Sequence, residues 1–584
     1  MRIKTILPLL CCLFVVLDVV GQQKDSIFVQ SGDTAMQKVF YFSYSKTDYV
    51  IKDLFHLDKD FSDIHYYDPT LETNNSFFQY LSVLGTPSLD LIYKTDDILN
   101  YQRQANNYKP YIFTNYSYNF SSVFSSQRNN VKYFQTQKAY SAFTYSAGTD
   151  AQQYFNVIFA KNLYKGLNLQ TEYNVNYADG NLANSQVMNQ FFNISLNYIS
   201  PKGLYKNSVS FVHSRAYILE NGGILSDSMF LKSEYSSMET YPTALTNGWS
   251  KWKTNEFYFN QSLRISKDTV HNYGALVHNI SYEKYARLYT DENKTQLDSL
   301  PTTLQRNSLY WTNVTKKDIL LPLHIGINYD RISFSDSLNK ENFDILTPEV
   351  RFGFKEYGEI SFLRSFSNNI YNKDYDVTLF VQYPYTSLLN TYLKAKIQDK
   401  QEDYIFSHYL TENLAWENKV NKVQTKSLTF GISLKKHFAL EISYFHLSNK
   451  YWFDSLYHLY SGSTNLYQIN FKNNFSFHNF VFKGLLSLQK TTNNEAIRLP
   501  VFAIKQTIYY SFYMMKGKLP AHFGVDINYN TNYYADLYRT TTGMFVRQND
   551  IQIGNHVYAD LFLSIRVQRF SIFASLTHLT SFLK

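Results

Sequence analysis

The sequence is poor in the residues and runs that define several common classes of protein. It has only two cysteines, Cys11 and Cys12, so the chain beyond them can form neither a disulfide scaffold nor a thiolate metal site. Glycine and proline number only 21 and 12, which excludes collagen-like and linker-rich chains. Beyond the N-terminus no run of about eighteen apolar residues occurs, so we expect no transmembrane helix.

Motifs that carry chemistry are also missing. The histidines are dispersed without an H-E-x-x-H pair, so no zinc site is predicted. The stretch from Asp58 begins like a calcium loop, but Asp63 stands where glycine is needed and Pro69 where the closing glutamate is needed. No G-x-S-x-G motif occurs. We therefore predict no metal, no cofactor and no enzyme, although a catalytic triad assembled from separate strands would leave no motif.

Charge and aromatic content narrow the class further. The formal net charge is +8 and the basic residues are dispersed, so a nucleic-acid surface is not expected. Aromatic residues reach 18%, with 52 tyrosines and 46 phenylalanines. Tyrosine pairs an apolar ring with a polar tip, which suits the interface between a membrane and water.

The first 21 residues read as a secretory signal. Arg2 and Lys4 precede an apolar centre at residues 6–17, and Gly21 offers a cleavage site before Gln22. Lipidation is not expected, because Leu10 rather than a small residue precedes Cys11. We divide the remaining chain into a periplasmic N-terminal segment, residues 22–80, and a barrel, residues 81–584.

The barrel prediction rests on a repeated alternation whose clearest copy is GLNLQTEYNVNY, residues 166–177. Odd positions are mostly apolar and even positions polar, which a β-strand sorts onto two faces. About eleven residues at roughly 3.3 Å each, tilted, match the hydrocarbon thickness of a bilayer. Similar rows occur at residues 192–198, 257–264, 321–329, 375–383, 427–434, 523–530 and 557–567. We predict an all-β fold, a large antiparallel transmembrane barrel of about 20–24 strands.

A soluble antiparallel β protein also alternates, but three features disfavour it. The segments are about ten to fourteen residues long against the usual five or six. The alternation continues without helical insertions, and the apolar rows tend to end in aromatic residues, as membrane girdles do. Long polar links at residues 179–188, 220–254, 290–305 and 530–555 are expected outside the cell, and the short turns in the periplasm.

Charged residues on the polar faces should meet water, because burying Arg or Lys against lipid costs about 2–4 kcal/mol near the midplane. Their signs are mixed, so no strong ion preference is predicted; alternatively, opposite charges pair and brace the barrel. These pore-lining candidates are Glu172, Arg264, Asp376, Lys394, Lys396, Glu441, Lys505, Asp526, Asp560 and Arg566.

A glycine-containing motif opens one of the long links. Glu220, Asn221, Gly222 and Gly223 favour a tight turn with positive φ. The simplest interpretation is the entry to a loop. The alternative is a role in binding a ligand or in constricting the pore.

Longer motifs resemble one family. They are DIHYYDPTLETNNSFFQYLSVLGTPSLDLIY at residues 63–93, YSAFTYSAGTDAQQYFNVIFAKNLYKGLNLQTEYN at residues 140–174, and ENGGI at residues 220–224. In these segments the chain is similar to the "putative β-barrel porin" family of Gram-negative outer membranes; the second half resembles the family only in its strand pattern. The resemblance implies a cell outer-membrane location and a pore.

The predicted function is diffusion of small hydrophilic solutes through a barrel set in outer-membrane lipid and lipopolysaccharide. The alternative is a structural or assembly barrel that binds partner proteins through its loops or periplasmic end. At the C-terminus, residues 570–583 should run outward, whereas the family pattern adds one more strand. We therefore expect either a truncated final strand or closure by an unusual pairing.

Overall fold

The structure is a computed structural model that describes residues 40–43, 65–66, 132–135 and 139–580. The last range has gaps at residues 149–150, 266–272, 293–297, 314–320, 336–339, 355–356, 386–388, 412–413, 435–436, 516–518, 568–569 and 577–578. No helix in these ranges is long and apolar enough to cross a membrane.

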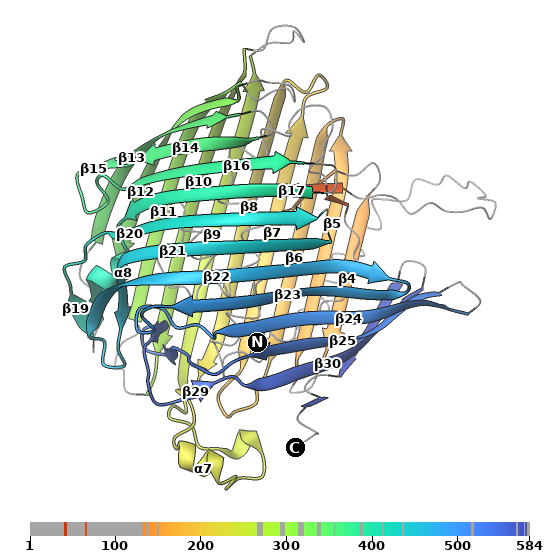
Figure 1. The fold of residues 1–584 in the computed structure, drawn as a ribbon, viewed down its shortest axis with the longest axis vertical. Helices are drawn as coiled ribbons and strands as arrows, with labels where there is room; N and C mark the ends of the chain where they lie inside the picture. The colour runs from red at the N-terminus through yellow and green to blue at the C-terminus, as the bar shows by residue number, and fades with distance from the viewer. Residues whose placement is uncertain are drawn as a thin grey trace. The chain divides into compact units, whose positions relative to one another are not determined.

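Most of the described chain forms one closed barrel in which sequential strands are neighbours and pair antiparallel (Figure 1). The fold class predicted from the alternation is confirmed. The first half of the barrel consists of β4 (Tyr140–Ala147), β5 (Gln153–Tyr164), β6 (Leu167–Ala178), β7 (Val187–Ile199), β8 (Tyr205–Glu220), β9 (Gly248–Arg264), β10 (Ala275–Thr290), β11 (Asp298–Thr312), β12 (Leu323–Ser335) and β13 (Lys340–Gly353).

The second half continues the same meander. Its strands are β14 (Gly358–Arg364), β15 (Phe366–Ser367), β16 (Tyr375–Pro384), β17 (Leu389–Lys400), β20 (Val423–Leu434), β21 (Phe438–Phe453), β22 (Leu459–Phe477), β23 (Phe480–Thr491), β24 (Phe502–Met514), β25 (Leu519–Asn530), β30 (His556–Val567) and β31 (Phe570–Leu576).

The barrel closes where β31 meets β4. Segments β14 and β15 both pair with β13 and are separated only by Ser365, so they are two pieces of one strand. The 22 segments in the described barrel thus make 21 strands. Because each pairing along the chain from β4 to β31 is antiparallel, these two strands run in the same direction, and the seam between them is parallel.

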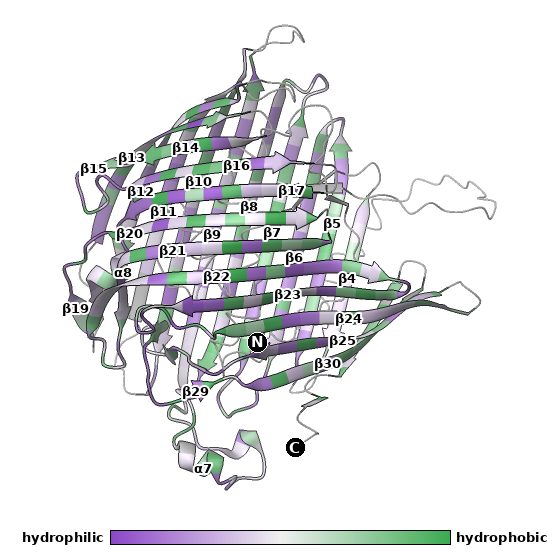
Figure 2. Ribbon diagram, viewed as in Figure 1, coloured by the Kyte–Doolittle hydropathy of each residue, from purple (hydrophilic) through white to green (hydrophobic). Residues whose placement is uncertain are grey.

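Hydrophilic and hydrophobic residues alternate along the barrel strands (Figure 2), and this alternation sorts their side chains onto the two faces of the sheet. On β6 and β7, polar residues such as Gln170 and Asn193 are at most 1% exposed, whereas Ile194 and Leu196 are about 40% exposed. The apolar residues therefore form the outer face and the polar residues the inner face. The ladder pairs the backbones of neighbouring described strands, and the apolar outer face has the composition expected of a lipid-facing surface.

The two ends of the barrel differ in their connections. Links at one end include residues 221–247, 401–422 and 531–555, and we call this the loop end. The opposite end, the turn end, has links as short as residues 165–166 and 478–479. The long links predicted from sequence are thus present, except that residues 290–305 contain a shorter loop, because β11 starts at Asp298 and continues the ladder with β10.

The long loops carry small elements of their own. They are α7 (Asp227–Leu231), η4 (Met238–Thr240), α8 (Tyr404–Ser407), β18 (His408–Leu410), β19 (Ala415–Glu417), β26 (Tyr533–Tyr534), β27 (Leu537–Arg539), β28 (Met544–Val546) and β29 (Gln552–Ile553). Strands β18 and β19 form a hairpin, and β27 and β28 form another inside the pairing of β26 with β29.

A separate three-stranded sheet precedes the barrel strands. It consists of β1 (Phe40–Ser43), β2 (His65–Tyr66) and β3 (Lys132–Gln135), in the order β2-β1-β3. Tyr133 of β3 packs with Phe191 and Val212 on the inner face of the barrel, and its hydroxyl donates to Ser210 Oγ at 3.1 Å. β1 therefore pairs with a strand that lies against the inner wall. The remainder of residues 22–80, including the calcium-like stretch from Asp58, lies outside the described residues, and the domain boundaries stay predictions.

Candidate functional site: the mouth of the barrel

Two of the long loops fold back onto the inner wall at the loop end. Loop 401–422 contains α8 and the β18–β19 hairpin, and loop 531–555 contains the β27–β28 hairpin. Each leaves the sheet at a different wall, between β17 and β20 and between β25 and β30 respectively. They meet in an apolar cluster that we call the mouth cluster.

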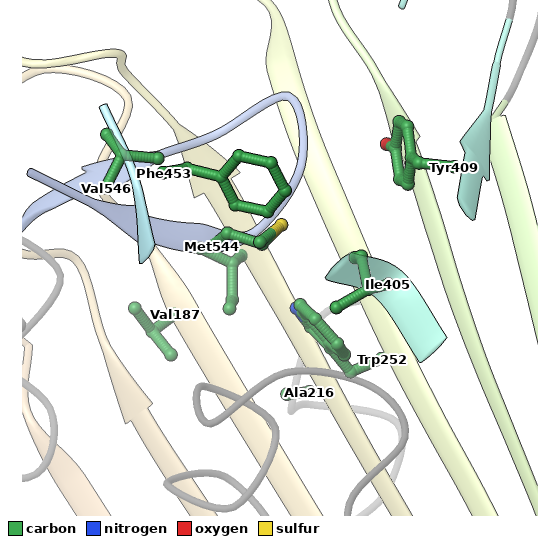
Figure 3. Close-up of a cluster of buried hydrophobic side chains, with 9 residues drawn as sticks. Val187, Ala216, Trp252, Ile405, Tyr409, Phe453, Met544 and Val546 are labelled. Atoms are coloured by element: carbon green, nitrogen blue, oxygen red, sulfur yellow. The ribbon is translucent and has the colours of Figure 1, made fainter. Parts of the chain in front are cut away.

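The mouth cluster joins loop side chains to the inner faces of three consecutive strands and of β21 (Figure 3). Ile405 and Tyr409 come from one loop and Met544 and Val546 from the other. All of its members are less than 9% exposed. The wall residues are Val187, Ala216, Ile218, Trp252 and Phe453.

Burial of the loop side chains is one contribution to the free energy that holds the loops against the inner wall. Burying an Ile, Val or Met side chain stabilises by roughly 1.5–3 kcal/mol. Ordering the loop backbone costs roughly 1–2 kcal/mol for each residue fixed. Because only four loop side chains enter the mouth cluster, their burial does not by itself offset the ordering of both loops, and the polar anchors described next also hold them.

Arg287, on the inner face of β10, anchors the tip of the β27–β28 hairpin. Its Nη1 donates to the Thr541 carbonyl at 2.7 Å, and its Nη2 donates to the Thr540 carbonyl. The guanidinium also lies over the rings of Trp252 and Tyr289, at 5.3 and 4.8 Å from their centroids. Bonds from a charged donor are among the stronger hydrogen bonds in proteins.

Gly543 lets the hairpin tip approach this anchor. Its φ is +67°, a conformation that glycine adopts readily. A Cβ at this position would lie 2.9 Å from both Arg287 Nε and Trp252 Cζ2. The glycine is therefore required by backbone conformation and by close packing.

Glu220 provides a second anchor for the same hairpin. It is 3% exposed, and it accepts hydrogen bonds from Ser250 Oγ at 2.6 Å and from the Tyr538 hydroxyl at 3.1 Å. Burial and the neighbouring Glu220 carboxylate raise the pKa of Tyr538 well above its ordinary value, so the phenol stays a donor. Glu220 of the E-N-G-G motif thus ties the end of β8 to the β27–β28 hairpin, and its predicted role in ligand binding or pore constriction stays a prediction.

The rest of the motif forms the entry to loop 221–247. Gly222 and Gly223 both have positive φ, at 69° and 92°. Asn221 Oδ1 accepts from the Gly223 backbone N–H at 2.9 Å, and the Asn221 carbonyl accepts from the Leu245 N–H at 2.8 Å. The predicted tight turn is therefore present.

The far side of the hairpin is also anchored. Arg539 Nη2 donates to the Ser455 carbonyl at 3.0 Å, and Tyr457 and Thr541 hydroxyls lie 2.9 Å apart. Arg547 pairs with Asp536 within the loop and donates to the Ala496 carbonyl at 2.7 Å. The hairpin therefore bridges walls formed by different parts of the barrel.

Loop 401–422 is held by stacking and by ion pairs. The Tyr404 ring stacks on Phe334 with centroids 4.4 Å apart, and Tyr409 stacks on Trp416 at the same distance. Lys450 Nζ lies 2.8 Å from Glu402 Oε1. Lys422 Nζ lies 2.7 Å from Asp374 Oδ1, which ties the end of the loop to residues 368–374.

The predicted pore-lining residues lie around the wall and do not converge on the mouth. Nine have side chains described by the structure, all on the inner face; the side chain of Arg566 lies outside the described residues. Lys396 Nζ and Asp376 Oδ2 form an ion pair at 2.8 Å between neighbouring strands. Asp526 lies directly opposite Asp560, and Glu441 accepts a hydrogen bond from the Tyr392 hydroxyl. The other candidates lie on separate strands: Glu172 on β6, Arg264 on β9, Lys394 on β17, Glu441 on β21, Lys505 on β24, Asp526 on β25 and Asp560 on β30.

Sequence reasoning missed the residues that build the mouth. Trp252 and Arg287 lie on inner faces with the polar residues, so alternation alone could have placed them in the lumen. Their partners are more than 250 residues away in the chain, which no local pattern reveals. Within the described ranges, no group of three or more His, Cys, Asp or Glu side chains is arranged to hold a metal ion.

The fold is shared with solved structures of siderophore receptors. A mutant of the ferric enterobactin receptor of Pseudomonas aeruginosa matches with a TM-score of 0.55 at 10% identity, covering 77% of each chain. The siderophore receptor PirA of Acinetobacter baumannii gives 0.54 at 9% identity, over 77% of this chain and 78% of that one. FpvA of P. aeruginosa gives 0.55 at 11% identity, over 77% and 69%.

No curated protein sequence matches the chain. The family model described as "Putative porin" matches residues 41–584, which is nearly the whole chain. The match agrees with the polar inner face and the apolar outer face of the barrel. The chain therefore belongs to the "Putative porin" family and is an outer-membrane β-barrel of the transport class.

Proposed function

We propose that this barrel passes small hydrophilic solutes across the outer membrane, and that loops 401–422 and 531–555 control entry at its mouth. The observation that carries the proposal is the mouth cluster, in which loops from different walls meet over the inner face. The polar inner wall supplies a path for hydrated solutes, and the apolar outer face suits contact with lipid and with the acyl chains of lipopolysaccharide.

The loops can move without breaking the barrel. Among the described residues neither hairpin is part of the barrel ladder, since β18 pairs with β19 and β27 pairs with β28. Releasing them breaks the contacts of the mouth and leaves the sheet intact. The siderophore receptors share the fold at 9–11% identity, so the ligands that they bind say nothing about the solute of this chain. The solute class is proposed instead from the polar side chains on this chain's own inner wall.

Conductance in planar bilayers tests the proposal. The variant replaces Leu537–Val546 with a short glycine-serine linker, which removes Met544, Val546 and the groups bound by Arg287. We expect more frequent or larger conductance steps than in the parent chain. The matched control shortens residues 226–240 of loop 221–247 and should conduct like the parent, because none of their described side chains belongs to the mouth cluster. Absence of conductance in parent and variant alike would overturn the proposal.

One observation favours a second function, the binding of a partner protein. Loop 221–247 is ordered by backbone hydrogen bonds and by the packing of Phe230 and Tyr235 around the buried Tyr241. It nevertheless exposes Leu225 and Leu231, at 63% and 81%. If the shortened-loop control lost a co-purifying partner while its conductance was unchanged, this second function would be supported.

A further inference from the structure

We infer that the outer face of β8, β9 and β10 carries a binding site for the phosphate groups of lipid A, the glycolipid anchor of lipopolysaccharide. The inference rests on the contact with lipopolysaccharide proposed above and does not depend on the passage of solutes. Four cationic side chains form the site, and we call them the basic patch: Arg215, Lys251, Lys253 and Lys284.

The register of the strands gathers these residues from distant parts of the sequence. Arg215 of β8 lies directly opposite Lys253 of β9, and Lys251 is the next residue on the same face of β9. Lys284 of β10 lies opposite Asn255, so it is diagonal to Lys253. Directly opposed residues of antiparallel strands have Cβ atoms about 4.5–5.5 Å apart, and diagonal neighbours about 7–8 Å apart. The long side chains of the basic patch can therefore reach one anionic group together.

Strand parity places the basic patch on the outer face of the barrel. Its positions on β9 alternate with those of Trp252 and Thr254, inner-face residues that are 6% and 8% exposed. They share a face with Phe257, which is 41% exposed and lies directly opposite Phe211, 40% exposed. Lys284 is exposed, and the other three cations of the patch are half-buried. Charge on this face is costly against hydrocarbon, and its cost falls toward the interface with water.

The surroundings of the basic patch are those of the headgroup level of a bilayer. The rise from the apolar Phe257 to Lys253, at roughly 3.3 Å per residue and tilted near 40°, is about 10 Å toward the loop end. Tyr217, opposite Lys251, packs its ring against Trp249, with the centroids 5.9 Å apart. Such aromatic residues concentrate where a bilayer meets water. Because the loop end is expected outside the cell, the patch faces the leaflet that holds lipopolysaccharide.

No acidic side chain balances the basic patch in the described part of the chain. The outer-face positions described on β7 to β11 hold no Asp or Glu, and none of the four cations forms an ion pair or a hydrogen bond there. On β12, by contrast, Arg331 lies opposite Asp344, with Nε 3.9 Å from Oδ1. Like charges directly opposite each other, such as Arg215 and Lys253, destabilise a sheet. An anion held between them removes that repulsion, so the patch favours a ligand with more than one negative charge.

Lipid A matches the basic patch in charge and in its division into a polar and an apolar part. Its sugar headgroup carries two phosphate groups, which arginine binds through paired N–H donors and lysine through its point charge. Its acyl chains would lie against the row of Phe211, Phe257 and Tyr282, on the turn-end side of the patch. A free phosphate ion matches the charge but gains nothing from this apolar row. We therefore assign the site to the lipid.

Lipid binding to the folded full chain in a neutral detergent tests the inference. Native mass spectrometry measures how tightly bisphosphorylated lipid A is retained by the parent and by the double variant Arg215→Gln with Lys253→Gln. We expect binding to weaken about 30-fold in the double variant, since each cation near a lipid headgroup contributes roughly a factor of five. Arg331→Gln is the matched control and should bind like the parent, because the charge of this outer-face arginine is paired with Asp344. Unchanged heat-modifiable migration on gels checks that each variant is folded.

Other probes identify the ligand. Lipid A without its phosphates and phosphatidylglycerol should both bind more weakly than bisphosphorylated lipid A, and inorganic phosphate at the same concentration should not displace it. Equal retention by parent and double variant, or equal binding of either comparison lipid, would overturn the inference. Displacement by inorganic phosphate, or retention of an acidic protein instead of lipid, would also overturn it. Phosphate-dependent binding in a chain that never conducts would support the site and refute the proposed passage of solutes.

Discussion

Replacing Arg287 with methionine should release the β27–β28 hairpin from the mouth. Methionine keeps an unbranched stem for packing against Trp252 but removes the two bonds to the Thr540 and Thr541 carbonyls. A hydrogen bond to a charged group contributes about 1.5–3 kcal/mol, so the lower figure for two bonds gives a loss of about 3 kcal/mol. That loss corresponds to a shift of roughly 100-fold toward the released hairpin.

Two measurements check the prediction for Arg287→Met. Single-channel recording should show a higher open probability, and a cysteine at Val546, which is 1% exposed in the closed arrangement, should label faster. Arg306→Met is the matched control, because Arg306 is also an inner-face arginine but binds Asp330 of the adjacent strand at 2.6 Å. If Arg287→Met and the control were indistinguishable from the parent in both assays, the hairpin would not be held by these bonds.

Three further predictions follow from the same geometry. Gly543→Ala should loosen the hairpin and speed labelling at Val546→Cys, since the new Cβ would meet Arg287 and Trp252. Gly203→Ala is the control and should leave that labelling rate unchanged, because Gly203 has a similar φ of +66° but no atom within 4 Å of the position of the added Cβ. Tyr538→Phe should also speed that labelling, because it removes the bond to the buried Glu220 at a cost of about 1–3 kcal/mol; equal rates in variant and parent would contradict the anchor. Leu196→Arg on the outer face should lower the free energy of unfolding in lipid by about 2–4 kcal/mol in a urea titration, whereas Leu231→Arg on the exposed α7 should leave it unchanged.

Alternation was enough to predict the barrel because the signal is local. Each strand needs only its own residues to sort into two faces, as the polar Gln170 and the apolar Leu169 do on β6. Strand boundaries were predicted less well, since residues 290–305 were expected to form a link although β11 starts at Asp298. The inner faces of the charged candidates could be read directly from parity.

The mouth could not be predicted in the same way. Residues 530–555 and 220–254 were recognised as long polar links, but alternation says nothing about where a loop goes after it leaves the sheet. The contact between Arg287 and Thr541 joins residues 254 positions apart, and its two sides carry no shared motif. Glu220 was singled out for its glycines, and its carboxylate proved to be the part that contacts the other loop.

The parallel seam between β31 and β4 has a consequence for how such a barrel could change in size. A β-hairpin adds or removes two strands at once, so duplication or deletion of hairpins preserves parity. Starting from the 21 described strands, every such step returns an odd number and leaves one pair of neighbours running in the same direction. The parallel seam is therefore kept whenever a whole hairpin is duplicated or deleted. Only the gain or loss of a single strand would make every pair of neighbours in the described sheet antiparallel.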